Sequence, residues 1–335
     1  MDFLKDVIKE IGDDYATVAN KIDDTERTVD TGSYILNALV SGSVFGGVSG
    51  NKITAIAGET STGKTYFSLA IVKNFLDKHP DGGVMYFDTE SAITKGLLES
   101  RGIDLERVGI INVVTIEQFR NRALTVVDKY LGLEESDRKP MMFVLDSLGM
   151  LSTEKEIKDA LDDKQVRDMT KSQLVKGAFR MLTLKLGQAN VPLIVTNHTY
   201  DVIGAYVPTK EMGGGSGLKY AASTIIYLSK GKEKDGTEVV GNIIKAKTVK
   251  SRLSRENRQV EIRLFYDERG LDRYYGLLDL AEKHGVIKKV ANRYEIDGKK
   301  VYAKEVYKNP EKYFTPELMQ ALDEVSVKEF TYGGE

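Results

Sequence analysis

The chain has 335 residues, of which 41% are hydrophobic and 29% charged, so it is long enough to bury a substantial core and has the composition of an ordinary globular protein. Its formal net charge of -2 argues against nucleic-acid binding through bulk charge, and the absence of cysteine excludes disulfides, thiolate nucleophiles and Cys-ligated metals. The three histidines are too scattered for a local zinc motif, the early charges do not fit a signal peptide, and no apolar run could span a bilayer, so we expect a soluble cytoplasmic protein that does not engage a membrane.

Residues 1–30 form the first segment of the predicted organisation. Phe3, Leu4, Ile8 and Ile11 recur at helical spacing, which predicts a short helix followed by a polar connector. The segment is acidic, which is the wrong sign for an arm that grips DNA. Its apolar stripe can dock on the core of its own chain or on a neighbouring subunit, and the sequence does not choose between the two.

From about residue 52, short strand-like runs alternate with helical stretches. The predicted strands cover residues 53–57, 83–88, 108–113, 141–146 and 192–197. The predicted helices cover residues 66–78, 94–101, 117–130 and 173–189. This alternation predicts an α/β core over residues 31–270 with a mostly parallel central sheet.

Two long polar stretches interrupt this pattern, and a further region follows it. The stretch over residues 147–172 shows no clean strand, and the stretch over residues 199–216 is rich in glycine. Loops of this length in a compact domain usually have a function or are mobile. Toward the C-terminus, a helix over residues 276–284 and short β-type pieces around the Asp297-Gly298 turn predict a small α+β domain, which we assign to residues 271–335.

A glycine-containing loop supplies the strongest single motif. It matches the pattern G-x-x-x-x-G-K-T and stands after a predicted strand and before a predicted helix. Backbone N–H groups of such a loop converge on phosphates, and the helix N-terminus adds a positive field. We expect Lys64 to reach the β and γ phosphates of a bound nucleotide and the hydroxyl of Thr65 to ligate Mg²⁺. The predicted nucleotide-binding residues are Gly58, Glu59, Thr60, Ser61, Thr62, Gly63, Lys64 and Thr65.

Carboxylates follow two of the predicted strands. Asp146 ends the most apolar strand, from where it can face the phosphate loop and hold the magnesium ion together with Thr65. Asp88 and Glu90 follow another strand and lie on one side of the extended chain, at the edge of the sheet where ligands bind in open α/β folds. Glu90 can therefore activate the attacking water. The alternative is that both are solvated acids at a strand end.

A histidine and a basic run complete the candidate residues. His198 follows the strand over residues 192–197, where a polar side chain can sense the γ-phosphate, although a lone histidine is more often structural. The basic run consists of Lys245, Lys247, Lys250, Arg252, Arg255 and Arg258. Because strand-like segments flank it, we expect part of the run to form the tip of a hairpin, where it can reach phosphates of nucleotide or DNA. The alternative is that these basic residues form an ordinary solvent-exposed face of the protein.

Taken in order, these blocks resemble the RecA family and, within it, the UvsX-type phage recombinases. The resemblance runs from about residue 31 to about residue 314. It is carried by TGS at 31–33, GETSTGKT at 58–65, YFDTESA at 86–92, FVLDSL at 143–148, TNHTY at 196–200, GGG at 213–215 running into LKYAAS at 218–223, and YGLLDL at 275–280. It implies a RecA-like P-loop NTPase core and a DNA-dependent ATPase that forms helical filaments on single-stranded DNA.

The resemblance also implies homologous pairing and strand exchange with double-stranded DNA, in recombination and repair. Mediator proteins and single-strand-binding proteins are then expected partners, and the host cytoplasm is the expected location if a phage encodes the chain. Two alternatives stay open. One is a ring-forming helicase built on the same core, and the other is an ATP-gated filament protein for which DNA is not the ligand.

The resemblance assigns roles that the residues alone leave open. Glu90 matches the family's catalytic glutamate, and His198 stands where bacterial relatives have the glutamine that couples the γ-phosphate to DNA binding. Lys245 and Lys247 match the basic pair that reaches the neighbouring subunit's ATP. A filament then completes the catalytic set, which links ATP binding to polymerisation. One departure is that the family's base-stacking tyrosine falls near Leu97.

The two polar stretches match the family's DNA-binding loops, at about 154–169 and 199–213. The resemblance implies that basic side chains there hold phosphates, apolar side chains separate groups of bases, and glycines let the backbone approach the DNA. The candidate phosphate contacts are Lys164, Arg167, Lys171 and Arg180. The candidate wedges are Val202, Ile203 and Tyr206, and the glycines are Gly213, Gly214 and Gly215. The alternative for each is a solvent-facing residue in a flexible loop.

Overall fold

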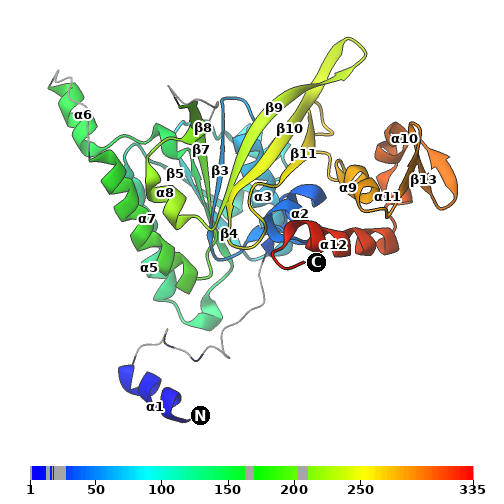
Figure 1. Cartoon of the computed structure of the whole chain (residues 1–335). Helices are drawn as coiled ribbons and strands as arrows, with labels where there is room; N and C mark the ends of the chain where they lie inside the picture. The colour runs from blue at the N-terminus through cyan, green and yellow to red at the C-terminus, as the bar shows by residue number, and fades with distance from the viewer. Residues whose placement is uncertain are drawn as a thin grey trace.

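A computed structural model describes residues 2–12, 16, 18, 28–162, 170–202 and 210–334. A large sheet lies at its centre, helices cover both faces of the sheet, and a lobe of short strands and helices lies beside it (Figure 1). The predicted α/β class is confirmed, and so is the N-terminal helix, α1 (Asp2–Ile11). Phe3, Leu4 and Ile11 of this helix are exposed. No helix among the described residues is long and apolar enough to cross a membrane.

The central sheet is mostly parallel, as predicted. Its strands are β3 (Ile53–Gly58), β4 (Gly83–Asp88), β5 (Val108–Asn112), β6 (Met141–Asp146), β7 (Leu193–Asp201), β8 (Lys210–Met212), β9 (Thr224–Asp235), β10 (Glu238–Ser251) and β11 (Gln259–Phe265). They run in the order β11-β10-β9-β3-β7-β6-β4-β5, with β8 paired to β7. The six strands from β9 to β5 pair in parallel, whereas β10, β11 and β8 add antiparallel pairs. A separate two-stranded sheet joins β1 (Thr28–Val29) to β2 (Val48–Ser49).

Helices cover the two faces of this sheet and bury a hydrophobic cluster on each. The helices of the core are α2 (Tyr34–Ser41), α3 (Lys64–Lys78), α4 (Lys95–Ser100), α5 (Ile116–Leu131), α6 (Glu154–Leu161), α7 (Lys171–Gln188) and α8 (Ser216–Ala221). Short 3₁₀ turns occupy Leu105–Arg107, Glu135–Asp137 and Leu148–Met150. Within β6, Phe143 and Leu145 join the cluster under α5 and α7, whereas Met142 and Val144 join the cluster under α2 and α3. Burial on both faces explains why this strand reads as one continuous apolar run.

The C-terminal region is a small α+β lobe whose core continues into that of the region around the central sheet. Its elements are α9 (Leu277–Lys283), β12 (Lys288–Val290), β13 (Arg293–Ile296), β14 (Lys299–Val301), α10 (Ala303–Lys308), α11 (Pro310–Tyr313) and α12 (Pro316–Phe330). Leu277, Leu322 and Phe330 belong to the same hydrophobic cluster as α2 and α3. Asp323 of α12 accepts hydrogen bonds from the Ser43 hydroxyl at 2.6 Å and the Val44 N–H at 2.9 Å. The domain boundary at residues 270/271 stays a prediction.

The two polar stretches contain more regular structure than the sequence predicts. The first includes α6, which begins with a capping box between Thr153 and Glu156. None of its residues is buried, so its apolar positions, Ile157, Ala160 and Leu161, do not pack into a core. In the second stretch, β7 continues to Asp201 and pairs with β8. Residues 163–169 and 203–209, at the centres of the two stretches, lie outside the described part of the chain.

The basic run is divided between a strand and a hairpin turn, which agrees with the prediction that part of it forms the tip of a hairpin. Lys245, Lys247 and Lys250 are inside β10, with Lys245 opposite Ser229 of β9 and Glu261 of β11, so these lysines do not form a hairpin tip. Arg252, Arg255 and Arg258 do lie in the turn that joins β10 to β11. A second hairpin, formed by β9 and β10, projects from the sheet (Figure 1).

Candidate active site

The glycine loop, residues 58–65, connects β3 to α3 as the sequence predicts. Gly63 has a φ of +88°, a left-handed conformation that favours glycine, and α3 begins at the next residue. Lys64 is buried, and its Nζ donates to the carbonyls of Gly58 at 3.0 Å and Glu59 at 2.8 Å. Burial lowers the pKa of Lys64, and the negative charges of Asp146 and Glu90 oppose that shift. The lysine therefore lies inside the loop at the start of the helix.

Asp146 accepts hydrogen bonds from three hydroxyl groups. The Thr65 hydroxyl donates to its Oδ2 at 2.7 Å and the Tyr86 hydroxyl at 2.8 Å, while the Thr196 hydroxyl donates to Oδ1. The two residues predicted to hold a metal are thus adjacent. Burial and the charge of Asp146 raise the pKa of Tyr86 well above its ordinary value. Sequence reasoning missed Tyr86 and Thr196, because both lie within apolar strands that read only as core.

Glu90 lies on a turn whose backbone Asp88 holds in place. The Asp88 carboxylate accepts from the N–H of Glu90 at 3.0 Å and from that of Ile93 at 3.1 Å. Asp88 is therefore buried in the turn and does not share the face of Glu90. The Ser147 hydroxyl donates to Glu90 Oε1 at 2.8 Å, and His198 Nε2 lies 3.6 Å from the same oxygen. Glu90 and His198, which the sequence predicts separately, therefore lie next to each other.

Asn197 connects the site around Glu90 and His198 to Gly213, which lies at the end of the second polar stretch. It is fully buried, and its amide Nδ2 donates to the Gly213 carbonyl at 2.9 Å. Its Oδ1 accepts from the N–H of His198 at 2.8 Å, and the Gly213 N–H donates to the His198 carbonyl at 3.1 Å. Nothing in the sequence signals this role, because Asn197 follows an apolar run as many polar residues do.

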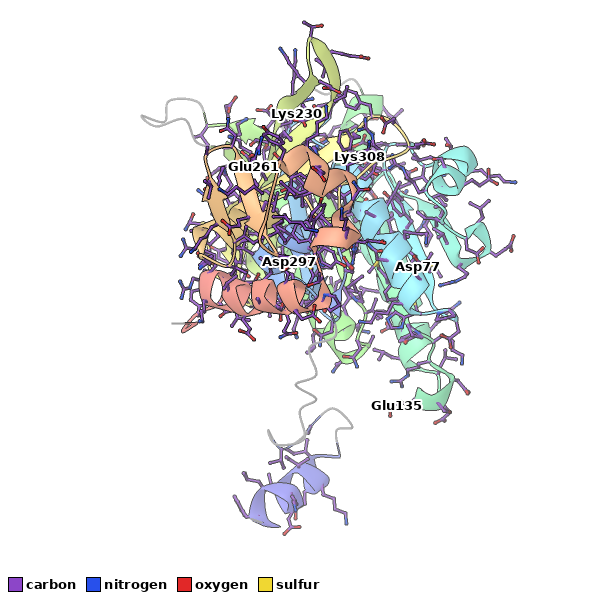
Figure 2. The ribbon with its side chains drawn as sticks, turned by 90° about the vertical axis from the view of Figure 1, so that its right-hand side faces the viewer. Asp77, Glu135, Lys230, Glu261, Asp297 and Lys308 are labelled. Atoms are coloured by element: carbon purple, nitrogen blue, oxygen red, sulfur yellow. The ribbon has the colours of Figure 1, made fainter. Side chains whose placement is uncertain are left out.

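Two lysines that the sequence did not single out contact the glycine loop. Lys210, on β8, forms an ion pair with Glu59. Lys230, on β9, donates to the Ser61 carbonyl at 3.1 Å. Figure 2 shows Lys230 toward the end of the molecule where the hairpin projects, and Glu135 at the opposite end. The loop is therefore approached by basic side chains from β8 and β9.

The predicted pair Lys245 and Lys247 is exposed on β10. Strand β9 lies between β10 and β3, which carries the glycine loop. Lys245 Nζ lies 3.5 Å from Glu261 Oε1 on β11. Within the described part of this single chain, neither lysine joins the group formed by Lys64, Asp146 and Glu90.

The candidate DNA contacts are only partly described. Lys164, Arg167, Ile203 and Tyr206 lie outside the described residues. Arg180 is exposed on α7, Val202 is exposed beyond β7, and Lys171 Nζ lies 3.3 Å from Glu156 Oε2. Gly214 and Gly215 have left-handed φ values of +82° and +75°, and a Cβ on Gly215 would lie 2.4 Å from the Ser172 hydroxyl oxygen. That glycine is thus required by the packing of its segment against α7.

Comparisons with known proteins agree on one family. The model of the RecA N-terminal domain matches residues 2–272. The chain is 33% identical over 274 residues to a recombination and repair protein of Enterobacteria phage T4, covering 82% of this chain and 68% of that protein. It is 28% identical over 308 residues to the RecA protein of Paenarthrobacter aurescens, covering 90% and 84%, and 30% identical over 302 residues to that of Paracoccus denitrificans, covering 89% and 78%.

Proposed function

Because the chain belongs to the RecA family, we propose that it is a DNA-dependent ATPase that assembles into helical filaments on single-stranded DNA and catalyses homologous pairing and strand exchange in recombination and repair. The observation that carries this proposal is the connected group at the carboxyl edge of the parallel strands. In that group, Lys64, Asp146 and Glu90 lie together beside the glycine loop. This is the arrangement that phosphoryl transfer to water requires.

ATP is proposed to bind along residues 58–65 with its β and γ phosphates at Lys64. In place of the carbonyls of Gly58 and Glu59, the ammonium group would then contact phosphate oxygens. Thr65 and Asp146 fit a magnesium ion, because a hydroxyl oxygen and a carboxylate oxygen lie 2.7 Å apart and oxygen is the donor that this ion prefers. When bound, the ion would neutralise charge on the β and γ phosphates.

Glu90 is proposed as the general base that takes a proton from the attacking water. Asp88 fixes the backbone of its turn, and Ser147 donates to one of its carboxylate oxygens, so that the other is left to face the water. His198 is proposed to respond to the γ-phosphate beside Glu90. Through Asn197, which is bonded to Gly213, a shift of His198 would reach the second DNA-binding stretch.

Lys245 and Lys247 are proposed to serve the ATP of the neighbouring subunit. Their exposure on β10 and their separation from their own glycine loop by β9 support this assignment. The proposed DNA contacts lie in and beside the two polar stretches. They are Lys164, Arg167, Lys171, Arg180, Val202, Ile203, Tyr206 and the segment 213–215. Mediator proteins and single-strand-binding proteins are proposed partners of the filament.

The test is ATP hydrolysis with and without single-stranded DNA across a salt series. We expect strong stimulation by DNA that weakens as salt rises, because phosphate contacts release counterions. Joint-molecule formation between a single strand and a homologous duplex, with a heterologous duplex as the control, separates a recombinase from a helicase. Hydrolysis that is indifferent to DNA would favour the non-DNA filament, and duplex unwinding without homologous pairing would favour the helicase.

A further inference from the structure

A cavity of about 690 Å³ lies beside the start of α3, next to the glycine loop. Its walls include Tyr66 and Arg101 and the segment 265–271. Strand β11, which leads into this segment, approaches the loop itself, because a Cβ on Gly63 would lie 3.5 Å from a methyl group of Leu264. The volume is within the range of small-molecule sites. Tyr66 directly follows Thr65, so the cavity begins where the proposed phosphate site ends.

The Arg101 guanidinium lies flat over the Tyr66 ring in this cavity, with 3.7 Å between its central carbon and the ring centroid. The Tyr66 ring is held in place, because its hydroxyl oxygen accepts a hydrogen bond from the Leu271 N–H at 3.0 Å. A Cβ on Gly270 would lie 2.3 Å from that oxygen, so the segment closes tightly on the ring. The pair therefore forms a fixed, flat and partly exposed surface.

Arg101 differs from the other cations that line the cavity. Each of the others is paired with a carboxylate: Lys73 with Asp77, Arg269 with Asp267, and Arg273 with Asp30. Among the described residues, no carboxylate forms an ion pair with Arg101. Since Tyr66 covers one face of the guanidinium, its other face and its N–H edges are available to a ligand. A planar, weakly hydrated cation in this state is a suitable partner for an aromatic ring.

We propose that Arg101, supported by Tyr66, is the stacking surface for the nucleobase of the bound nucleoside triphosphate. This inference rests on the proposed ATPase function and extends it to the base. Leu97, the position that resemblance assigns to base stacking, does not line the cavity and packs on the hydrophobic cluster instead. Stacking on a guanidinium uses the flat face of the base, which every base possesses, so purine triphosphates other than ATP are expected to bind as well.

Equilibrium binding of ATP and of ribose 5-triphosphate, which lacks the base, tests the proposal. The wild-type chain is expected to bind ATP about tenfold more tightly than ribose 5-triphosphate, the contribution of one stacked base. Arg101→Lys keeps the charge but removes the planar group. In that variant the affinity for ATP is expected to fall about tenfold, to the level of ribose 5-triphosphate, while the affinity for ribose 5-triphosphate stays unchanged.

Arg120→Lys is the matched control, because Arg120 lies on α5, a helix on the opposite face of the sheet, and should leave both affinities unchanged. Equal wild-type affinities for ATP and ribose 5-triphosphate would overturn the stacking proposal without any variant. So would an Arg101→Lys variant that binds ATP like the wild type, or one in which both affinities fall together, which would place Arg101 on phosphate. A wild-type chain that binds neither compound would instead overturn the proposed function, and the inference with it.

Discussion

At the scale of single residues, the site depends on side chains that position other side chains. Glu90 is fixed from two sides, through its backbone by Asp88 and through its carboxylate by Ser147. Asp146 is fixed by hydroxyl groups from three different elements, namely α3, β4 and β7. Groups held in this way need little reorganisation during a reaction, which is a general condition for efficient catalysis.

Glu90→Gln is the prediction that belongs to this scale. The variant keeps the shape of the side chain and can still accept the hydrogen bond from Ser147, but it cannot take a proton from water. We expect ATP hydrolysis to fall by about 10²–10⁴-fold, with ATP and single-stranded DNA binding retained. Steady-state hydrolysis and filter binding of DNA in the presence of ATP measure the two properties. A variant that hydrolyses ATP at the wild-type rate would show that another group is the base.

At the scale of elements, Asp30 links the start of the α/β core to the segment that leads into the C-terminal lobe. Its Oδ1 accepts from the Gly32 N–H at 2.7 Å and from the Asn37 amide at 3.0 Å, and its Oδ2 accepts from Arg273 at 2.5 Å. Burial opposes ionisation of this carboxyl, but the hydrogen bonds from Arg273 and Asn37 outweigh burial and hold the pKa of Asp30 below its ordinary value. One carboxylate therefore joins β1, α2 and residue 273.

Because the folded-state pKa of Asp30 is lowered, its ionised form stabilises the folded chain above the unfolded-state pKa of about 3.8. That contribution is lost as the pH falls through the lower, folded-state pKa. We expect Asp30→Asn to lower the free energy of unfolding near pH 7 by on the order of 1 kcal/mol, since the pair is partly exposed. Urea unfolding of both chains at pH 7 and near pH 3 measures the difference. It should shrink at the lower pH, and a difference that grows there would contradict the assignment.

At the scale of the whole molecule, the exposed lysines on β10 support the proposal that the active site is divided between subunits. The glycine loop, Glu90 and Asp146 lie at the carboxyl edge of the parallel strands. Lys245 and Lys247 lie on β10, which β9 separates from the strand that carries the loop. A head-to-tail assembly brings two different surfaces of identical chains together and extends indefinitely when its rotation does not close. A filament can therefore complete a site that a single chain leaves incomplete.

Mixing two inactive variants tests this division. Lys64→Arg disables the phosphate loop, and the double variant Lys245→Ala with Lys247→Ala disables the other surface, so each alone is expected to lose DNA-stimulated hydrolysis. An equal mixture should regain activity, up to about a quarter of the wild-type rate, because random neighbours restore that fraction of complete sites. Mixing Lys64→Arg with Glu90→Gln is the control, since both changes lie in the same half-site. Recovery in the control alone, or in neither mixture, would contradict a shared site.

The sequence by itself determined the class of the fold and predicted the main residues of the candidate site. Alternating strand and helix patterns are local, and in a parallel sheet the carboxyl ends of strands meet at one edge. Polar residues that follow different strands, such as Asp146, Glu90 and His198, are thereby predicted to meet although they are far apart in the chain. The glycine loop adds a motif whose chemistry follows from its own backbone.

Only the tertiary structure decided which other side chains support these residues. Tyr86 and Thr196 lie in strands buried on both faces, where an apolar run does not reveal which way each side chain points. Asn197, Lys210 and the pair of Arg101 with Tyr66 depend on contacts between segments that the sequence does not place side by side. Helix α6 begins with a local capping signal but has no buried face to mark it. Local patterns specify elements and edges, whereas the partners of a side chain are set by packing between distant segments, which a single sequence does not display.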